Sequence, residues 1–260
     1  MKRKIYIYSI LYLCLGCVSV EYFPNKIEST LISESKISSP KKSSKYKQNG
    51  IFKSIVIDGI IYKGTVDVSN VAFERSKKIL DFMLSEVPKV RKELQEIKFS
   101  IVIFPPNLKI TDMPEYADFK GQTFHQRTQG LRTEDSVQGQ TEFHLSSTSE
   151  KNLLGYFVEG HITLVHEMAH AIHKHLSRED VDDIRRAYIN AVKKRIYPMS
   201  HYIMENSYEY WAVASESWLN TTRLTDHNGG FETRDKIKSH DPELAKILEM
   251  VYGSRDLILN

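Results

Sequence analysis

The sequence predicts an α+β domain in which early strands are followed by a mostly helical C-terminal half. Two observations support this fold class. The β-rich runs "SIVIDGIIYKG" and "KFSIVIF" both lie before residue 105, and helical patterns fill most of the chain after residue 160. The composition, with 41% hydrophobic and 27% charged residues, is that of a globular protein.

The first fifty residues are expected to lie outside that domain. In residues 1–20, "MKRK" precedes the apolar run "IYIYSILYLCLGC", which is typical of an export signal and too short for a membrane crossing of about 20 residues. Gly16-Cys17 resembles the lipidation site of a bacterial lipoprotein; a conventional secreted or periplasmic protein and an uncleaved anchor are the alternatives. Residues 21–50 are rich in Ser and Lys and predict a solvated tether. Membrane contact is expected only through the N-terminal lipid or signal anchor.

Residues 51–260 form the predicted domain, and their charge argues against a nucleic-acid partner. Nine of the 36 basic residues and three of the 33 acidic residues fall in residues 1–50, so the domain has a charge of −3 although the whole chain has +3. A mildly acidic domain lacks the basic surface that binds phosphate backbones. Both cysteines, Cys14 and Cys17, precede the domain, which therefore has neither a disulfide nor a thiolate ligand.

Local patterns predict the first elements of the domain in order. Asp58-Gly59 between two β-rich segments is the signal of a tight hairpin. Apolar residues at helical spacing predict a helix over residues 70–86, and Pro88 can open a second short helix. The β-branched and aromatic run at 98–104, closed by two prolines, predicts a buried strand.

The later elements follow a less regular stretch. Residues 107–140 show no clear period, which is typical of a functional or partly disordered loop. "TEFHL", residues 141–145, alternates polar and apolar residues and predicts a short strand. Four helices are then expected: at about residues 160–176, from Ser177 with "SRED" as its cap, near 206–220, and in "DPELAKILEMVYG".

The segment "ITLVHEMAHAIHKH", residues 162–175, contains a metal-binding pattern. His166 and His170 are four residues apart, so on a helix their imidazoles share one face, about 5 to 6 Å apart at Cβ, and can converge on one ion. Glu167 lies beside them and can act as a general base on a water at the metal without being a ligand. The spacing predicts one Zn²⁺ per chain; the alternative is a chance pattern in a histidine-rich helix.

A third ligand must lie downstream. The metzincin pattern needs Gly and His where this chain has His173 and Leu176, and the thermolysin pattern needs a helical Glu where "AYINAVKK" has none. In "SHYIMENSYEYWAVASESWLN", residues 200–220, Glu209 and Glu216 share one helical face with small residues. A carboxylate in such surroundings can approach a second helix closely.

This segment resembles the second metal motif of one zincin group: the lethal-factor catalytic domain, the Pro-Pro endopeptidases and the Mlc titration factor A proteins. In that group, Glu-aromatic-aromatic-Ala follows the HExxH helix; here Glu209-Tyr210-Trp211-Ala212 begins 39 residues after His170. The resemblance covers about residues 150–220. It implies a zincin-like α+β fold, in which a small twisted mixed sheet carries an active-site helix, and it implies Glu209 as third zinc ligand. The first two families also carry a tyrosine seven residues before that glutamate. This implies that Tyr202 stabilises the oxyanion, with a core or surface role as the alternative.

Other side chains near the motif receive smaller roles. Toxin-like members have a further acid where this chain has Val213, whereas Glu216 matches the titration-factor pattern and is expected to accept a hydrogen bond from a ligand histidine. His173 is expected to be exposed, with a supporting contact at the metal site as the alternative. His161 and His175 are expected to face solvent.

These features predict a zinc metalloendopeptidase that acts on a peptide or protein substrate. The strand predicted at 141–145 could hold that substrate extended by edge pairing. A zinc-containing surface binding protein with weak or no hydrolysis is the alternative, and a surface adhesin is a third interpretation that depends on the N-terminus alone. An open coordination position and the adjacent Glu167 both favour the enzyme, because a structural zinc site needs neither an open position nor a general base.

Overall fold

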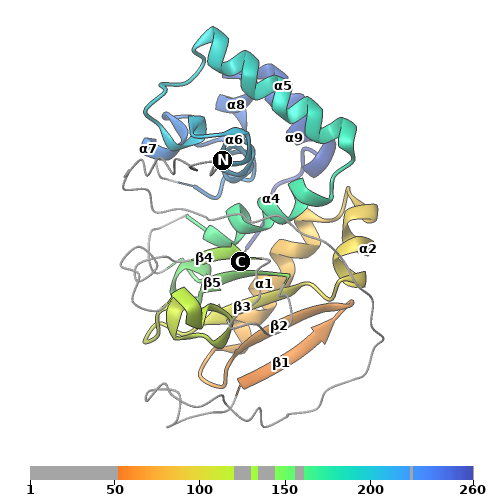
Figure 1. Cartoon of the computed structure of the whole chain (residues 1–260), viewed down its shortest axis with the longest axis vertical. Helices are drawn as coiled ribbons and strands as arrows, with labels where there is room; N and C mark the ends of the chain where they lie inside the picture. Colours follow the sequence, from red (N-terminus) through yellow and green to blue (C-terminus); the bar gives the residue numbers. More distant parts are fainter. Residues whose placement is uncertain (1–51, 120–129, 134–143, 156–160, 223–224, 260) are drawn as a thin grey trace, which may run out of the picture.

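The structure, a computed structural model, describes residues 52–119, 130–133, 144–155, 161–222 and 225–259 (Figure 1). Its strands form a mixed five-stranded sheet in the order β1-β2-β3-β5-β4. The inner strands β2, β3 and β5 are parallel, whereas β1 and β4 are antiparallel to their neighbours. The strands are β1 (Phe52–Ile57), β2 (Ile60–Thr65), β3 (Ser100–Phe104), β4 (Gly130–Thr133) and β5 (Leu145–Ser149). With the helices that follow, this sheet confirms the predicted α+β class.

The β1–β2 hairpin forms because its two turn residues adopt left-handed backbone angles. Asp58 has a φ of 50° and Gly59 a φ of 77°, as a type I′ turn requires at both central positions. Ile57 pairs with Ile60 across the turn. The side-chain amide of Gln95, on helix α2 (Pro88–Glu96), donates a hydrogen bond to the carbonyl of Asp58 at 2.7 Å. The hairpin predicted from Asp-Gly is therefore confirmed.

The first two helices begin where the sequence predicts. Ser69 caps α1 (Asn70–Met83), since its hydroxyl accepts a hydrogen bond from the Ala72 amide at 3.2 Å. Pro88 is the first residue of α2. Proline has no N–H, which is harmless at this position because the first N–H groups of a helix have no acceptor within the helix. Helix α1 ends at Met83, three residues before the predicted end at residue 86.

Strand β3 is buried on both faces, as its apolar sequence predicts. Ile101 and Ile103 belong to the main core, which they share with α1 and α2. Val102 and Phe104 belong to a second cluster on the opposite face. That cluster is completed by the 3₁₀ turns η1 (Ile110–Asp112) and η2 (Pro114–Phe119) and by Leu145.

Two predictions between residues 107 and 145 need correction. The stretch predicted to lack regular structure contains η1, η2 and β4, which are too short to show a period. Of the strand predicted at 141–145, Leu145 begins β5, His144 lies outside any strand, and residues 141–143 lie outside the described residues. The segment "LSSTS" has four small polar residues after Leu145 and shows no alternation, yet all five residues are buried, because β5 lies between β3 and β4.

The C-terminal half is helical, as predicted, and Figure 1 shows α4 between the sheet and the helices α5, α6 and α9. Four predicted helices are confirmed: α4 (Thr163–His175), α5 (Arg178–Lys194), α6 (Ser207–Trp218) and α9 (Pro242–Tyr252). Three short helices were not predicted: α3 (Glu150–Leu153), α7 (Thr225–Asn228) and α8 (Arg234–His240). Such short helices contain too few residues to show helical periodicity. A 3₁₀ turn, η4 (Tyr202–Met204), precedes α6.

The predicted export signal, Cys17 and the tether lie outside the described residues, so these predictions stay predictions. Within the described part of the chain, no helix has the length and hydropathy that a membrane crossing needs.

Candidate metal centre

Helix α4 carries the HExxH motif and is enclosed by its neighbours. The hydroxyl of Ser146 on β5 donates a hydrogen bond to the Glu167 carbonyl at 3.2 Å. On the opposite side, Trp211 Nε1 of α6 donates to the Ala169 carbonyl at 2.9 Å. The ten residues from Leu164 to His173 are all buried, so no face of the helix is open to solvent over this stretch.

The start of α4 is fixed by distant residues and not by a local cap. Ile162, at the N-cap position, provides no side-chain hydrogen bond. The Thr163 amide donates instead to Oδ1 of Asn152 in α3 at 2.7 Å, and Nδ2 of Asn152 donates to the His161 carbonyl at 3.3 Å. The Ile162 amide donates to the carbonyl of Thr221, just after α6, at 3.0 Å. These contacts hold α4 in a fixed position relative to α6.

Helix α6 supplies Glu209 in its first turn. The side chain of Asn206 accepts hydrogen bonds from the Tyr208 and Glu209 amides, each at 2.9 Å, and so caps the helix. The Glu209 side chain is buried where α6 packs on α4. Ala212 and Val213, one turn further on, are small enough for the two helices to approach closely.

The structure brings His166, His170 and Glu209 together, although Glu209 lies 39 residues after His170. The Nε2 atoms of the two histidines are 3.1 Å apart. Oε2 of Glu209 lies 3.1 Å from His166 Nε2, and Oε1 lies 3.6 Å from His170 Nε2. All three side chains are buried. The three residues form a group that could hold a metal ion, hereafter the metal group.

The surroundings of Glu209 favour its charged form. Burial alone raises the pKa of this carboxyl, but the nearby imidazoles of His170 and His166 lower it. A hydrogen bond from the Tyr202 hydroxyl acts in the same direction, and the net result is a lowered pKa. A carboxylate that stays ionised in a buried site is available as a ligand for a cation.

Two predicted catalytic side chains lie beside the metal group. Glu167 follows His166 on α4 and is buried. Tyr202 in η4 stacks on His166, with ring centroids 6.1 Å apart and an interplanar angle of 17°. A further ring, that of His227 in α7, lies 5.2 Å from Tyr202. No sequence pattern pointed to His227, because α7 is too short to show helical periodicity.

Glu216 lies two turns after Glu209 on α6 and contacts two histidines. Its Oε2 is 3.3 Å from Nδ1 of His166, and its Oε1 is 3.4 Å from Nδ1 of His161. The expectation that His161 faces solvent is wrong, since only 8% of this residue is exposed. His161 precedes α4 and lies outside any periodic pattern, so the sequence offered no signal for its contact with Glu216.

Two further expectations about histidines are also wrong. His173 is buried, with its ring 5.0 Å from that of Tyr208 and 6.1 Å from that of Trp211. It does not belong to the metal group. His175 is half-buried, and its Nδ1 lies 3.2 Å from Oε2 of Glu93 in α2. Both errors arise because α4 is enclosed by α2, α6 and the sheet, which its own sequence does not reveal.

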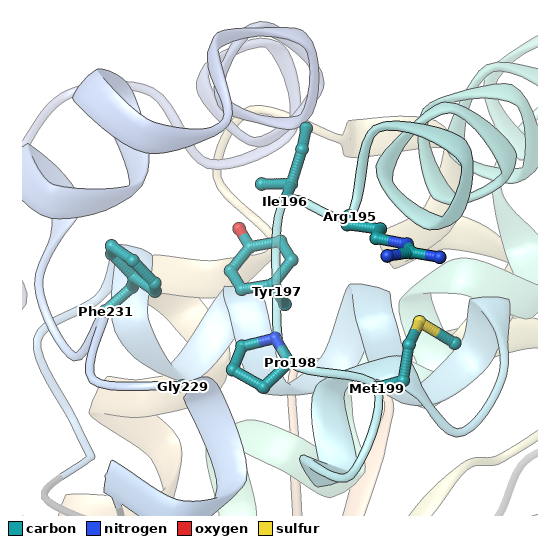
Figure 2. A pocket seen from close by; sticks show the side chains of 7 residues that line it. All are labelled: Arg195, Ile196, Tyr197, Pro198, Met199, Gly229 and Phe231. Carbon is teal, nitrogen blue, oxygen red and sulfur yellow. The ribbon is translucent and has the colours of Figure 1, made fainter.

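An open pocket of about 430 Å³ lies apart from the metal group (Figure 2). Its lining contains a guanidinium and a phenol but no carboxylate or imidazole. The lining residues are Arg195, Ile196, Tyr197, Pro198, Met199, Gly229 and Phe231. The side chains suited to metal chemistry are therefore at the metal group and not in this pocket.

Comparisons of the chain with protein-family models, with curated proteins and with solved structures find no match. The resemblance to the zincin group therefore depends on its sequence motifs alone.

Proposed function

We propose that the protein is a zinc-dependent metallopeptidase whose metal is held by His166, His170 and Glu209. The observation that carries this proposal is the closeness of the donor atoms: the two histidine Nε2 atoms are 3.1 Å apart, and the two Glu209 oxygens lie 3.1 Å (Oε2) from His166 Nε2 and 3.6 Å (Oε1) from His170 Nε2. Ligand atoms about 2.0 to 2.1 Å from a tetrahedral zinc ion lie about 3.3 Å from one another, so these atoms fit one ion with little movement. Two imidazoles and one carboxylate form a ligand set of catalytic zinc sites.

The proposed reaction is the hydrolysis of a peptide bond. A bound zinc ion supplies Lewis-acid chemistry, lowering the pKa of a water and polarising a carbonyl. The carboxylate of Glu167 accepts a proton from the attacking water and passes it to the leaving nitrogen. The Tyr202 phenol donates a hydrogen bond to the oxyanion as negative charge develops. Glu216 accepts the Nδ1–H of His166, which leaves Nε2 of that ring to the metal.

The proposed substrate is an extended peptide that pairs with strand β4. This strand pairs with β5 on one side, packs against α4, and has no strand on its other side among the described residues. An unpaired edge offers backbone hydrogen bonds to an added strand. The role expected for the strand at 141–145 therefore moves to β4, because β5 is paired on both sides. A sheet, an HExxH helix against it and a second helix bearing a glutamate form the arrangement that the zincin resemblance implies.

A zinc-containing binding protein is the second candidate. It accounts for His166, His170 and Glu209 equally well. Glu167 separates the two candidates, because a protein that uses zinc only for binding has no need of a buried carboxylate next to a ligand histidine. We favour the peptidase for this reason.

The proposal is tested with Glu167→Gln in the full chain. This change keeps the size of the side chain but removes the base, so zinc content is expected to stay near one equivalent while turnover of a peptide library falls about 10²- to 10⁴-fold. Elemental analysis measures the metal, and mass spectrometry measures the cleavage products. Glu179→Gln, the same change at an exposed position of α5, is the matched control and should leave both quantities unchanged.

Each outcome has a distinct meaning. Hydrolysis that survives Glu167→Gln contradicts the assignment of the base. A wild-type chain that binds zinc but cleaves no peptide supports the binding protein instead. Less than about half an equivalent of zinc would remove both candidates.

A further inference from the structure

We propose that His161 is a positioning residue of the metal centre, which acts on the ligand His166 through the carboxylate of Glu216. This inference depends on the metal-binding part of the proposed function and not on peptide cleavage. Each oxygen of Glu216 faces a different imidazole: Oε2 lies 3.3 Å from His166 Nδ1, and Oε1 lies 3.4 Å from His161 Nδ1. The carboxylate therefore connects a residue outside the metal group to a ligand.

The burial of Glu216 explains why it needs a second partner. The residue is only 1% exposed, and a buried carboxylate is costly unless both of its oxygens find partners. Oε1 is buried and makes no hydrogen bond within the described part of the chain, and the same is true of His161 Nδ1. The contact at 3.4 Å places these two atoms beside each other. A small rotation of the His161 ring would turn this ion-pair contact into a hydrogen bond.

The backbone holds His161 and Glu216 in this relation. The Thr221 amide donates to the Glu216 carbonyl at 2.9 Å, and the Thr221 carbonyl accepts from the Ile162 amide at 3.0 Å. Nδ2 of Asn152 donates to the His161 carbonyl at 3.3 Å. These backbone hydrogen bonds therefore fix the positions of His161 and Glu216 before any metal binds.

The consequence for the metal is a choice of tautomer and orientation in His166. The contact between His161 Nδ1 and Oε1 of Glu216 fixes the position of the Glu216 carboxylate. Its other oxygen, Oε2, can then accept a hydrogen bond from the Nδ1–H of His166. The Nε2 lone pair of His166 then points toward His170 and Glu209, whose donor atoms lie 3.1 Å away. Without His161, Glu216 can turn away from His166, and zinc must order both side chains when it binds.

The test compares zinc affinity in the full-length wild-type chain and its variants, by competition with a chelating dye. His161→Leu removes the contact to Glu216 and should weaken zinc binding by about 10- to 100-fold, as supporting partners of metal ligands usually do. His161→Asn keeps an N–H donor near the position of Nδ1 and should restore most of the affinity. The absorption spectrum of the Co²⁺-loaded protein should change in His161→Leu and resemble wild type in His161→Asn.

The matched control is a second contact between a histidine and a glutamate, at the C-terminal end of α4. His175 lies 3.2 Å from Glu93 of α2 and does not belong to the metal group, so His175→Leu should leave zinc affinity and the Co²⁺ spectrum unchanged. Urea unfolding in the presence of chelator measures any loss of stability in the metal-free protein. This separates an effect on the metal site from a general weakening of the fold.

Several outcomes would overturn the inference. One is an unchanged zinc affinity in His161→Leu. Another is an equal loss of zinc affinity in His161→Asn and His161→Leu. If the Leu variant does not fold, His161→Gln takes its place. The Gln amide lies near the position of Nε2 and not of Nδ1, so this variant should bind zinc more weakly than His161→Asn. Equal zinc affinities of the Gln and Asn variants would contradict the proposal. A wild type that binds zinc without cleaving peptides removes only the peptidase. A wild type that binds no zinc removes both.

Discussion

Helices α4 and α5 follow each other in the chain but are stabilised in opposite ways. Helix α5 obeys local rules: Ser177 caps it, acidic residues occupy its first turn, lysines occupy its last, and only three of its 17 residues are buried. Helix α4 has no side-chain cap and no acidic first turn, and ten of its 13 residues are buried. Its support comes from α3, α6 and β5.

The difference shows what a buried polar site requires. Three of the four histidines of α4, together with Glu167, are buried and need partners from other elements. A helix that displays ligands inside the protein therefore depends on tertiary contacts for its stability, whereas α5 needs only one apolar stripe. Substitutions at the contacts of α4 should consequently cost more than comparable substitutions on α5.

The largest difference is expected at Trp211, which packs α6 against α4. Trp211→Ala removes a fully buried ring and its hydrogen bond to the Ala169 carbonyl, and should lower the free energy of unfolding by about 3 to 5 kcal/mol. Urea unfolding with chelator present measures this value. Ile189→Ala on α5, where the side chain is 38% exposed, should cost less than about 1.5 kcal/mol. Similar losses at the two positions would contradict the comparison.

The caps of the two helices provide a finer test. Asn152→Ala removes the acceptor of the half-buried Thr163 amide and the donor to the buried His161 carbonyl. It should cost about 1 to 3 kcal/mol, because these groups lose their partners away from solvent. Ser177→Ala removes only an exposed cap, for which about 1 kcal/mol is typical. Chemical denaturation of both variants gives the comparison. A larger loss of unfolding free energy in Ser177→Ala than in Asn152→Ala would show that α4 does not depend on its contacts with Asn152.

The smallest effect is expected on the exposed face of α5. Arg178 lies 4.0 Å from Asp182, and its side chain is 97% exposed. Arg178→Ala should therefore change the free energy of unfolding by less than about 0.5 kcal/mol, since exposed ion pairs contribute little. Thermal unfolding at low and high salt checks this expectation. A loss above about 1 kcal/mol at either salt concentration would mean that local surface contacts matter more to α5 than we infer.

Part of the candidate site could be predicted because it belongs to one helix. The positions of His166, Glu167 and His170 follow from the helical repeat, so their relation was visible in five consecutive residues. Glu209 shares a helical face with Glu216, and only the resemblance to a known motif favoured one over the other. The burial of His161 and His173 was missed, because their neighbours come from other elements.

Features that depend on a few adjacent residues could be predicted from the sequence: the Asp58-Gly59 turn, the starts of α2 and α5, and the spacing of His166 and His170. Each of these follows from backbone angles, from hydrogen bonds within one turn, or from the repeat of one helix. Three other features follow from the packing of the elements: the burial of α4 from Leu164 to His173, the meeting of Glu209 with two histidines, and the position of Glu216 between His166 and His161. Such contacts depend on which elements pack together and how closely, and periodicity within a single element carries no information about that.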